Sequence, residues 1–381
     1  YPLQLIFLQN QMRTSPLVTV LMTVYNGAEY LNASVQSIIN QTFEDFEFLI
    51  INDCSTDDSI KIIKSFNDKR ITIHNNEKNL GQTKSLNIGL KLVKGKYVAR
   101  MDADDMAFPL WLEKLLKFFE KHQEYAAIGS QAIVIDSTGK RKKTRTVPGS
   151  YHEIIFRIFF DSPMNHVSVL LNKELILRNG GYDEEFKITQ DYELWSSLIR
   201  NNYSITNIPD TLVSYRVHEN SKGVVEADKR GLEENSKIIF KNINFFTNMQ
   251  ITYVEAVELY KLFYHTSGLN SKEFGRAETN FENIYSNMKE EYKLPPEFTG
   301  KGIKTMMLKP YCKLAISEIQ NNKLKTARKI ALKYCSRYGF RVMPFLIYIS
   351  TFFGQEISEK LPLVHEKYLE LKTKIFITNY L

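Results

Sequence analysis

The feature that most constrains the fold is a short apolar run that ends in three carboxylates. Residues 97–101 (Tyr-Val-Ala-Arg-Met) have the apolar and β-branched character of a buried strand, and Asp102, Asp104 and Asp105 follow at once. Carboxylates this close repel one another at neutral pH, whereas a divalent cation such as Mg²⁺ or Mn²⁺ prefers oxygen ligands and completes its shell with substrate phosphates. The alternative is an acidic turn that caps a helix expected near Pro109.

Strands alternate with helices through the first part of the chain. We expect strands at 17–24, 46–51, 70–74 and 97–101, and helices at 28–41, 57–66 and 80–93. This alternation predicts a doubly wound, mostly parallel α/β sheet, in which ligands bind beyond the carboxyl ends of the strands. Tyr25, Asp53 and the carboxylates at 102–105 all lie at such ends, so three strands direct polar groups at one crevice.

The rest of the chain falls into two regions. We expect helices at 109–122, 151–160, 174–178 and 191–201, strands at 126–136, 166–171, 203–208 and 211–217, and a basic loop at 136–150. Beyond about residue 222 the apolar periodicity becomes helical. We therefore predict an α/β domain at 12–223 and a helical, basic region at 224–381. Residues 1–11 are apolar but lack the basic segment and cleavage site of a signal peptide, so we interpret them as a non-native or disordered extension before Met12.

Composition and missing motifs narrow the class of protein. A chain of 381 residues with 43% apolar residues has room for two or three domains and a large core. The three cysteines are scattered and form no CxxC pair, which favours a reducing, cytoplasmic setting. The first strand is not followed by GxGxxG, and the chain contains no GxxxxGK[ST], which argues against NAD and P-loop chemistry.

A series of short motifs occurs in a fixed order between about residues 16 and 223. They are residues 20–26, 37–42, 51–58, 79–81 with Asn87 and Gly89, 101–105, 180–183 and 190–195. The ordered series resembles family 2 glycosyltransferases of the GT-A fold, of the bacterial surface-polysaccharide kind. The resemblance implies an inverting, metal-dependent transfer of one sugar from a UDP-sugar to a glycan or lipid-linked glycan, in O-antigen, capsule or lipooligosaccharide synthesis. The alternative is a non-catalytic nucleotide-sugar-binding or scaffold protein of the same pathway.

The resemblance also implies which residues bind the donor. Asp53 would accept a hydrogen bond from the uracil N–H, and Tyr25 would lie against the uracil ring with Thr23 nearby. Asp102 would bind the ribose or the donor sugar, and Lys84 could contact phosphates. The alternatives are that Asp53 caps the next helix and that Tyr25 packs at the sheet edge.

The metal is expected to be Mn²⁺ or Mg²⁺. The resemblance implies that Asp104 is its ligand, with Asp105 as a second ligand or a support and His218 as a further candidate. Such a cation neutralises the charge that grows on the departing UDP. A plain surface position is the alternative for His218, and Arg216 is a weaker candidate for a phosphate contact.

Asp191 is the predicted general base. It opens an amphipathic helix, and it would take the proton of the acceptor hydroxyl on the face opposite the UDP, which gives inversion. Gln190 precedes it where the family more often has Glu, so Asp191 is the single base of this pair. The alternative is a helix N-cap. His166 is expected to line the acceptor site.

The chain has neither the Gln-x-x-Arg-Trp motif typical of processive polymerases nor a stretch long enough to span a membrane, which favours transfer of a single sugar. Residues 301–341 hold eleven Lys and Arg against Glu318 alone, and the uncharged run 342–354 follows. This pattern predicts a peripheral contact of 301–354 with an anionic membrane, at the inner face of the cytoplasmic membrane. The alternative is that the apolar run packs in a helical core or in a homodimer. No nucleic-acid-binding signature is present, so we expect no nucleic-acid partner.

Overall fold

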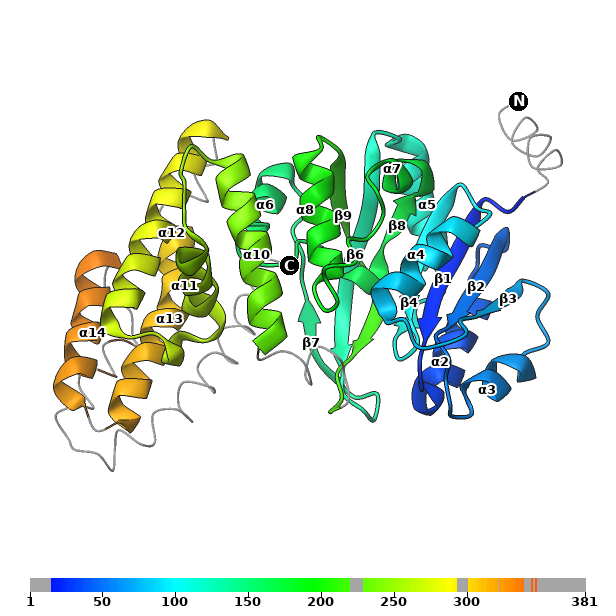
Figure 1. Cartoon of the computed structure of the whole chain (residues 1–381), viewed down its shortest axis with the longest axis horizontal. Coiled ribbons are helices and arrows are strands. Elements are labelled where there is room, and N and C mark those ends of the chain that lie inside the picture. Colours follow the sequence, from blue (N-terminus) through cyan, green and yellow to red (C-terminus); the bar gives the residue numbers. More distant parts are fainter. Residues whose placement is uncertain are drawn as a thin grey trace. The chain divides into compact units, whose positions relative to one another are not determined.

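The computed structural model describes residues 15–219, 229–292, 301–321, 323–338, 344 and 347. The chain divides into two compact units, Tyr1–Phe246 and Thr247–Leu381 (Figure 1). The division falls later than the boundary at 223 that the sequence suggested, so one long helix belongs to the first unit. The predicted extension 1–11 and all but two residues of the run 342–354 lie outside the described residues.

The first unit is built on one nine-stranded sheet with the order β3-β2-β1-β4-β8-β6-β9-β5, and β7 pairs with β6. The strands are β1 Val18–Val24, β2 Phe46–Asn52, β3 Ile71–Asn75, β4 Tyr97–Asp102, β5 Met106–Ala107, β6 Tyr125–Ile135, β7 Arg141–Arg145, β8 Leu170–Asn172 and β9 Ser204–Arg216. The first four strands of this order are parallel, while β8 runs antiparallel to both β4 and β6. The predicted α/β class is therefore confirmed, and the sheet is mixed beyond β4.

Helices cover the sheet because its central strands are apolar on both faces. They are α2 Ala28–Ile39, α3 Ser59–Ser65, α4 Gln82–Leu92, α5 Trp111–Lys121, α6 Tyr151–Arg157, the short η1 His166–Ser168, α7 Lys173–Arg178, α8 Gln190–Arg200 and α10 Lys229–Phe246. Every residue of β1 is buried, as expected for a strand covered from two sides. Trp111 and Phe119 of α5 are fully buried in the same core cluster.

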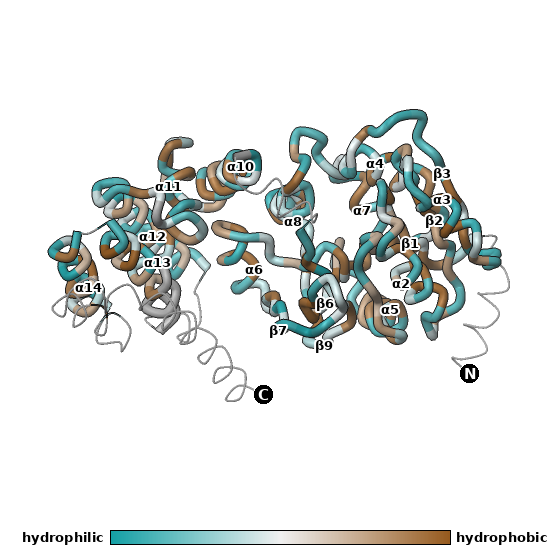
Figure 2. The backbone as a smooth tube through the Cα atoms, turned by 90° about the horizontal axis from the view of Figure 1, so that it is seen from below, coloured by the Kyte–Doolittle hydropathy of each residue, from teal (hydrophilic) through white to brown (hydrophobic). Residues whose placement is uncertain are grey.

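Three local predictions need correction. The predicted basic loop 136–150 contains the strand β7, whose residues are hydrophilic (Figure 2). The strand forms because β7 pairs with β6, and its polar sequence alone does not indicate this pairing. The first half of the strand expected at 166–171 is the 3₁₀ turn η1, and β8 begins only at Leu170. The two closing strands are one strand, β9, which stays paired with β6 through shifts in register around Pro209.

The second unit is helical, as predicted. Its described elements are α11 Tyr253–Tyr264, η2 Thr266–Gly268, α12 Ser271–Glu291, α13 Lys301–Gln320 and α14 Leu324–Tyr338. Within the described ranges, no helix is both long and apolar enough to cross a bilayer.

A buried carboxylate joins three helices of this unit. Glu278 of α12 is fully buried and accepts hydrogen bonds from Tyr311 of α13 and from Tyr338 of α14, at 2.9 Å for the latter. Lys333 and Arg337 of α14 form ion pairs with it at 2.8 and 3.3 Å. Part of the basic run 301–341 thus balances an internal charge.

Candidate active site

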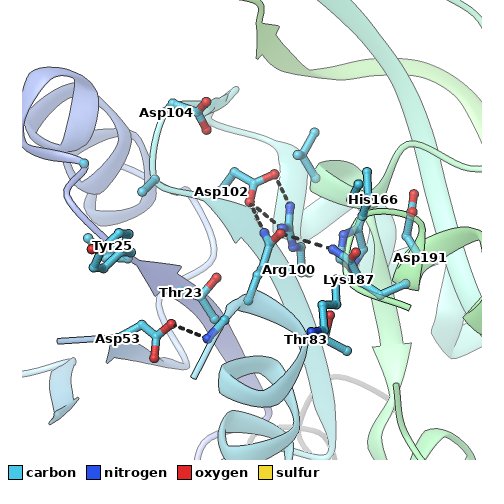
Figure 3. A pocket seen from close by; sticks show the side chains of 18 of the residues that line it. Thr23, Tyr25, Asp53, Thr83, Arg100, Asp102, Asp104, His166, Lys187 and Asp191 are labelled. Carbon is cyan, nitrogen blue, oxygen red and sulfur yellow. Dashed lines mark hydrogen bonds and ion pairs between the residues drawn. The ribbon is translucent and has the colours of Figure 1, made fainter. Parts of the chain in front are cut away.

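A cavity of about 850 Å³ opens at the carboxyl ends of β1, β2 and β4. Nine of the predicted site residues line it: Thr23, Tyr25, Asp53, Lys84, Asp102, Asp104, His166, Asp191 and His218. Figure 3 shows Asp53, Thr23 and Tyr25 at one side of this pocket and His166 and Asp191 at the other, with Asp102 between them. Asp105 is the predicted residue that does not line the pocket, because its side chain is buried beneath the turn.

Asp53 follows β2 and is bound from three sides. Its Oδ1 accepts hydrogen bonds from Asn76 Nδ2 at 2.8 Å and from the Leu80 amide at 2.9 Å, and its Oδ2 accepts one from the Gly81 amide at 2.8 Å. Gly81 has φ +85°, a backbone conformation that favours glycine. Asp53 therefore fixes the loop before α4 and does not cap α3, the next helix. A carboxylate has about four acceptor sites, so Oδ2 retains capacity for a ligand.

Two of the residues that line the pocket are exposed. Tyr25 is 51% exposed, so its ring is available to stack on a ligand and is not packed at the sheet edge. Lys84 on α4 is also exposed, with its ammonium 4.0 Å from Glu184 Oε2. A surface pair at this distance contributes little to stability, which leaves Lys84 able to turn toward a phosphate.

Asp102, at the end of β4, is held by a buried arginine. Arg100, two residues earlier on the same strand, is 1% exposed and forms a bidentate ion pair with the Asp102 carboxylate. Gln82 Nε2 donates to Asp102 Oδ1 at 3.1 Å. Pairing and hydrogen bonding compensate the cost of burying the guanidinium and fix the carboxylate in one orientation.

Asp104 faces the pocket together with His218. His218 Nε2 lies 3.1 Å from Asp104 Oδ2, and its ring packs against Tyr30 with the ring centroids 5.0 Å apart. Burial raises the pKa of the Asp104 carboxyl, the nearby Asp102 charge adds to this, and the contact with His218 opposes it. Pocket burial and repulsion between carboxylates are conditions that a bound cation would relieve.

Asp105 and Arg216 support the turn from below. The Arg216 amide donates to Asp105 Oδ1 at 2.6 Å, and Arg216 Nε donates to the Asp104 carbonyl at 2.9 Å. Burial raises the pKa of Asp105 well above its usual range, and repulsion from Asp104 adds to it. Arg216 is almost fully buried and holds this turn in place, and it also lines the pocket. The phosphate contact suggested by the sequence stays a prediction.

The acidic turn fits a divalent cation in its donor set. One oxygen from each of Asp102, Asp104 and Asp105 lies within 4.8 Å of the others. Asp105 Oδ2 is buried and has no hydrogen-bond partner among the described residues. Carboxylate oxygens and an imidazole nitrogen are suitable ligands for Mn²⁺. Asp104 and His218 are placed to be direct ligands, since both line the pocket.

Asp191 is the second residue of α8 and lies at the other side of the pocket. The N-cap of α8 is Thr189, so Asp191 does not occupy the capping position. Burial raises the pKa of the Asp191 carboxyl, while the Tyr192 amide and the positive charge of Arg145 oppose this shift. Ser162 Oγ lies 3.4 Å from Asp191 Oδ2. A carboxylate with a raised pKa is a stronger base, which suits proton abstraction.

His166 also lines this side of the pocket. Its Nε2 lies 2.8 Å from the Tyr182 hydroxyl, and its ring meets Trp195 edge to face with the centroids 6.1 Å apart. Burial lowers the pKa of His166 well below its usual range, and the charge of Arg100 adds to this, so the imidazole is neutral at pH 7. The His166 ring can therefore form a hydrogen bond with a bound ligand but carries no charge.

Sequence reasoning missed Arg145 and Gln82 as pocket residues. Arg145 lies on β7, in a stretch that was predicted to be a loop. Its guanidinium packs over Tyr215, 5.4 Å from the ring centroid, and no ion pair or hydrogen bond of this side chain is found within the described part of the chain. The ion pair between Arg100 and Asp102 could have been predicted from the sequence, because Arg100 is a charged residue in an otherwise apolar strand.

The chain belongs to glycosyltransferase family 2. The model of "Glycosyl transferase family 2" matches residues 19–179. An uncharacterized glycosyltransferase of Haemophilus influenzae is 34% identical over 273 residues, which cover 68% of this chain and 84% of that protein. The O-antigen biosynthesis glycosyltransferase WbnJ of Escherichia coli is 31% identical over 219 residues, which cover 55% of this chain and 83% of WbnJ.

Solved structures show the same fold. Residues 1–349 of S. aureus TarS, in complex with UDP-GlcNAc, match with a TM-score of 0.53 and 16% identity, over 84% of this chain and 92% of that one. The mannosyltransferase PcManGT of Pyrobaculum calidifontis, in complex with GDP-Man and Mn²⁺, matches with a TM-score of 0.50 and 15% identity, over 87% of this chain and 94% of that one. The predicted GT-A fold is confirmed, and identities this low carry no information on the donor.

Proposed function

We propose that the protein transfers a single sugar from a UDP-sugar to a glycan or lipid-linked glycan, with inversion at the anomeric carbon and with Mn²⁺ or Mg²⁺ as cofactor. The observation that carries this proposal is the meeting of Asp53, Asp104 and Asp191 in one cavity, each from a different strand or helix end. These three carboxylates supply an acceptor for a base N–H, a metal ligand and a general base, which are the groups that such a transfer needs.

The donor would lie across the carboxyl ends of the parallel strands. Asp53 would accept the uracil N–H with its remaining acceptor site, and the exposed Tyr25 ring would stack on the base. Asp102, fixed by Arg100, would bind hydroxyl groups of the ribose or the donor sugar. Because the ion pair is formed before the donor arrives, little orientation entropy is lost on binding.

Asp104 and His218 would hold the cation, and Asp105 would support them from below. A bound cation would neutralise charge on the departing diphosphate. Asp191 would take the proton of the attacking hydroxyl, and its raised pKa makes that transfer more favourable. A single base opposite the leaving group supports one displacement and hence inversion.

The acceptor is proposed from the relatives and from the charge of the second unit. WbnJ is named for O-antigen biosynthesis, which supports a role in bacterial surface polysaccharide synthesis. The basic segment that begins at residue 301 would contact an anionic membrane and bring the enzyme to a lipid-linked acceptor. Sedimentation with anionic vesicles, compared with neutral ones at rising salt, would test this contact.

The decisive experiment measures UDP release from a panel of UDP-sugars with Mn²⁺, with GDP-mannose as a donor of the other nucleotide class. We expect turnover of one UDP-sugar, and we expect the Mn²⁺-dependent turnover to be lost in Asp104→Ala. In Asp191→Asn we expect kcat to fall about 10²-fold with little change in donor KM. Turnover of GDP-mannose alone would refute the UDP assignment. If no donor is turned over and calorimetry detects no UDP binding, a scaffold protein becomes the better explanation.

A further inference from the structure

A buried carboxylate of α10 binds the loop that leads into α8. Glu234 is 5% exposed, and it accepts hydrogen bonds from three consecutive backbone amides. They come from Lys187 at 3.0 Å, Ile188 at 2.9 Å and Thr189 at 3.0 Å, and the Thr189 hydroxyl donates a fourth at 3.1 Å. A buried carboxylate is costly unless it is well hydrogen-bonded, and here both oxygens have donors.

The loop that Glu234 binds is part of the pocket wall. Lys187 and Ile188 line the cavity, Thr189 is the N-cap of α8, and Asp191 follows two residues later. On its other side the loop is held by Thr83 of α4, whose hydroxyl donates to the Phe186 carbonyl at 2.8 Å (Thr83 is labelled in Figure 3). The position of Asp191 therefore depends on a loop fixed between α4 and α10.

Further contacts tie α10 to α8 along their length. Asn242 Nδ2 donates to Ser196 Oγ at 2.9 Å and to the Ile158 carbonyl at 2.6 Å. Lys241 Nζ lies 3.2 Å from Glu193 Oε1, which is itself almost fully buried. These contacts stabilise the packing of the two helices, whereas Glu234 binds the segment that starts α8 next to Asp191.

We propose that Glu234 is a positioning residue for the reaction: its carboxylate holds the 187–189 amides so that Asp191 meets the attacking hydroxyl. This inference rests on the proposed function, in which Asp191 is the general base. It adds a functional residue from α10, which lies beyond the segment 19–179 that the family model matches. A misplacement of about 1 Å can reduce a rate about 10²-fold, so a residue without substrate contact can matter this much.

The test is a double-mutant cycle between Glu234→Ala and Asp191→Asn in the full chain. The measured rate is that of UDP release when water attacks the UDP-sugar that the enzyme turns over. We expect Glu234→Ala to lower kcat about 10- to 100-fold with donor KM within about twofold, and to have almost no further effect in the Asp191→Asn background. Equal effects of Glu234→Ala in both backgrounds would overturn the proposal, because a purely structural loss does not depend on Asp191. An unchanged rate of UDP release in Asp191→Asn would also overturn the proposal.

Hydrogen exchange provides a readout that needs no turnover. The 187–189 amides should exchange faster in Glu234→Ala, and Glu234→Gln should restore part of the protection and of kcat, since its amide oxygen can still accept. Glu233→Gln is the matched control: Glu233 is the exposed neighbour on the same helix and pairs with Lys237 at 3.0 Å. Unchanged exchange in Glu234→Ala would refute the contact itself. Absence of UDP binding in the wild-type protein would instead refute the proposed function.

Discussion

At the scale of single residues, the environment of Asp191 bears on its proposed role as the general base. Burial raises its pKa, and Arg145 partly opposes the shift. If Asp191 is the base, as proposed, it must be ionised, and activity is then lost as the pH falls through this raised pKa. The acid limb of the kcat profile should therefore lie above the value of 3.8 for an ordinary Asp.

Replacing Arg145 should move this limb further. Arg145→Leu removes a positive charge that stabilises the ionised Asp191, so the acid limb of the kcat–pH profile should shift to higher pH. Arg145→Lys keeps the charge and serves as the control. If the limb of Arg145→Leu coincides with that of the wild type, the two groups are not coupled.

Asp53 should contribute both to donor binding and to stability. In Asp53→Asn one oxygen remains for three donors, from Asn76, Leu80 and Gly81. Leaving buried donors without a partner costs about 1–3 kcal/mol in the free energy of unfolding. Urea unfolding without UDP measures this loss, and calorimetry measures the weaker UDP binding. Asp58→Asn, at an exposed position nearby, should be neutral; a stable Asp53→Asn protein would argue against the structural role.

At the scale of elements, the packing of α4 gives a structural reason for Asn87 and Gly89, two residues of the motif series. Asn87 binds the Tyr182 backbone at both its carbonyl, at 2.8 Å, and its amide, at 2.9 Å, and so fixes the turn after Gly180 and Gly181. Gly89 lies where α4 packs on β1: an added Cβ would come within 2.4 Å of a methyl carbon of Leu21. The helix carrying Gln82 and Lys84 can approach the sheet only because this residue has no side chain.

Gly89→Ala should therefore destabilise the protein, although alanine is the better helix former. Overpacking of this kind costs about 1–3 kcal/mol. Gly275→Ala in α12 is the matched control, since no atom lies within 4 Å of its added Cβ, and it should stabilise by about 0.4–1 kcal/mol. Calorimetric unfolding of both variants measures the two signs. Equal shifts would show that the contact with Leu21 relaxes without cost.

At the scale of the whole molecule, the first unit ends at Phe246, after α10. Ile238, Ile239 and Ile243 of this helix are fully buried, and Glu234 binds the loop before α8. The boundary near residue 223 that the sequence suggested would separate all four side chains from the first unit.

Two truncated chains should show which of the two boundaries, after residue 223 or after residue 246, leaves a stable first unit. A chain that stops after residue 246 should unfold cooperatively and bind UDP, whereas one that stops after residue 223 should lose stability, because it exposes the apolar face of α8 that packs against α10. Circular dichroism melting and calorimetry with UDP measure both properties. Equal behaviour of the two truncations would show that α10 is dispensable.

The sequence by itself determined the α/β class, the positions of the central strands and the direction of Asp53, Asp102 and Asp104 toward one crevice, while Asp191 was predicted through the family resemblance. It could do so because apolar periodicity is local and because parallel strands place their carboxyl ends at one edge. The roles of these residues stay predictions until donor binding is measured.

Only the tertiary structure revealed what holds these residues in place. The donors to Asp53 lie 23 to 28 residues away, and Glu234 lies about 45 residues from the amides it binds. The pairing of β7 with β6 and the continuity of β9 likewise depend on partners in other segments. Such contacts leave no periodic signal in the chain, because a polar side chain has the same local pattern whether it faces water or a distant backbone amide.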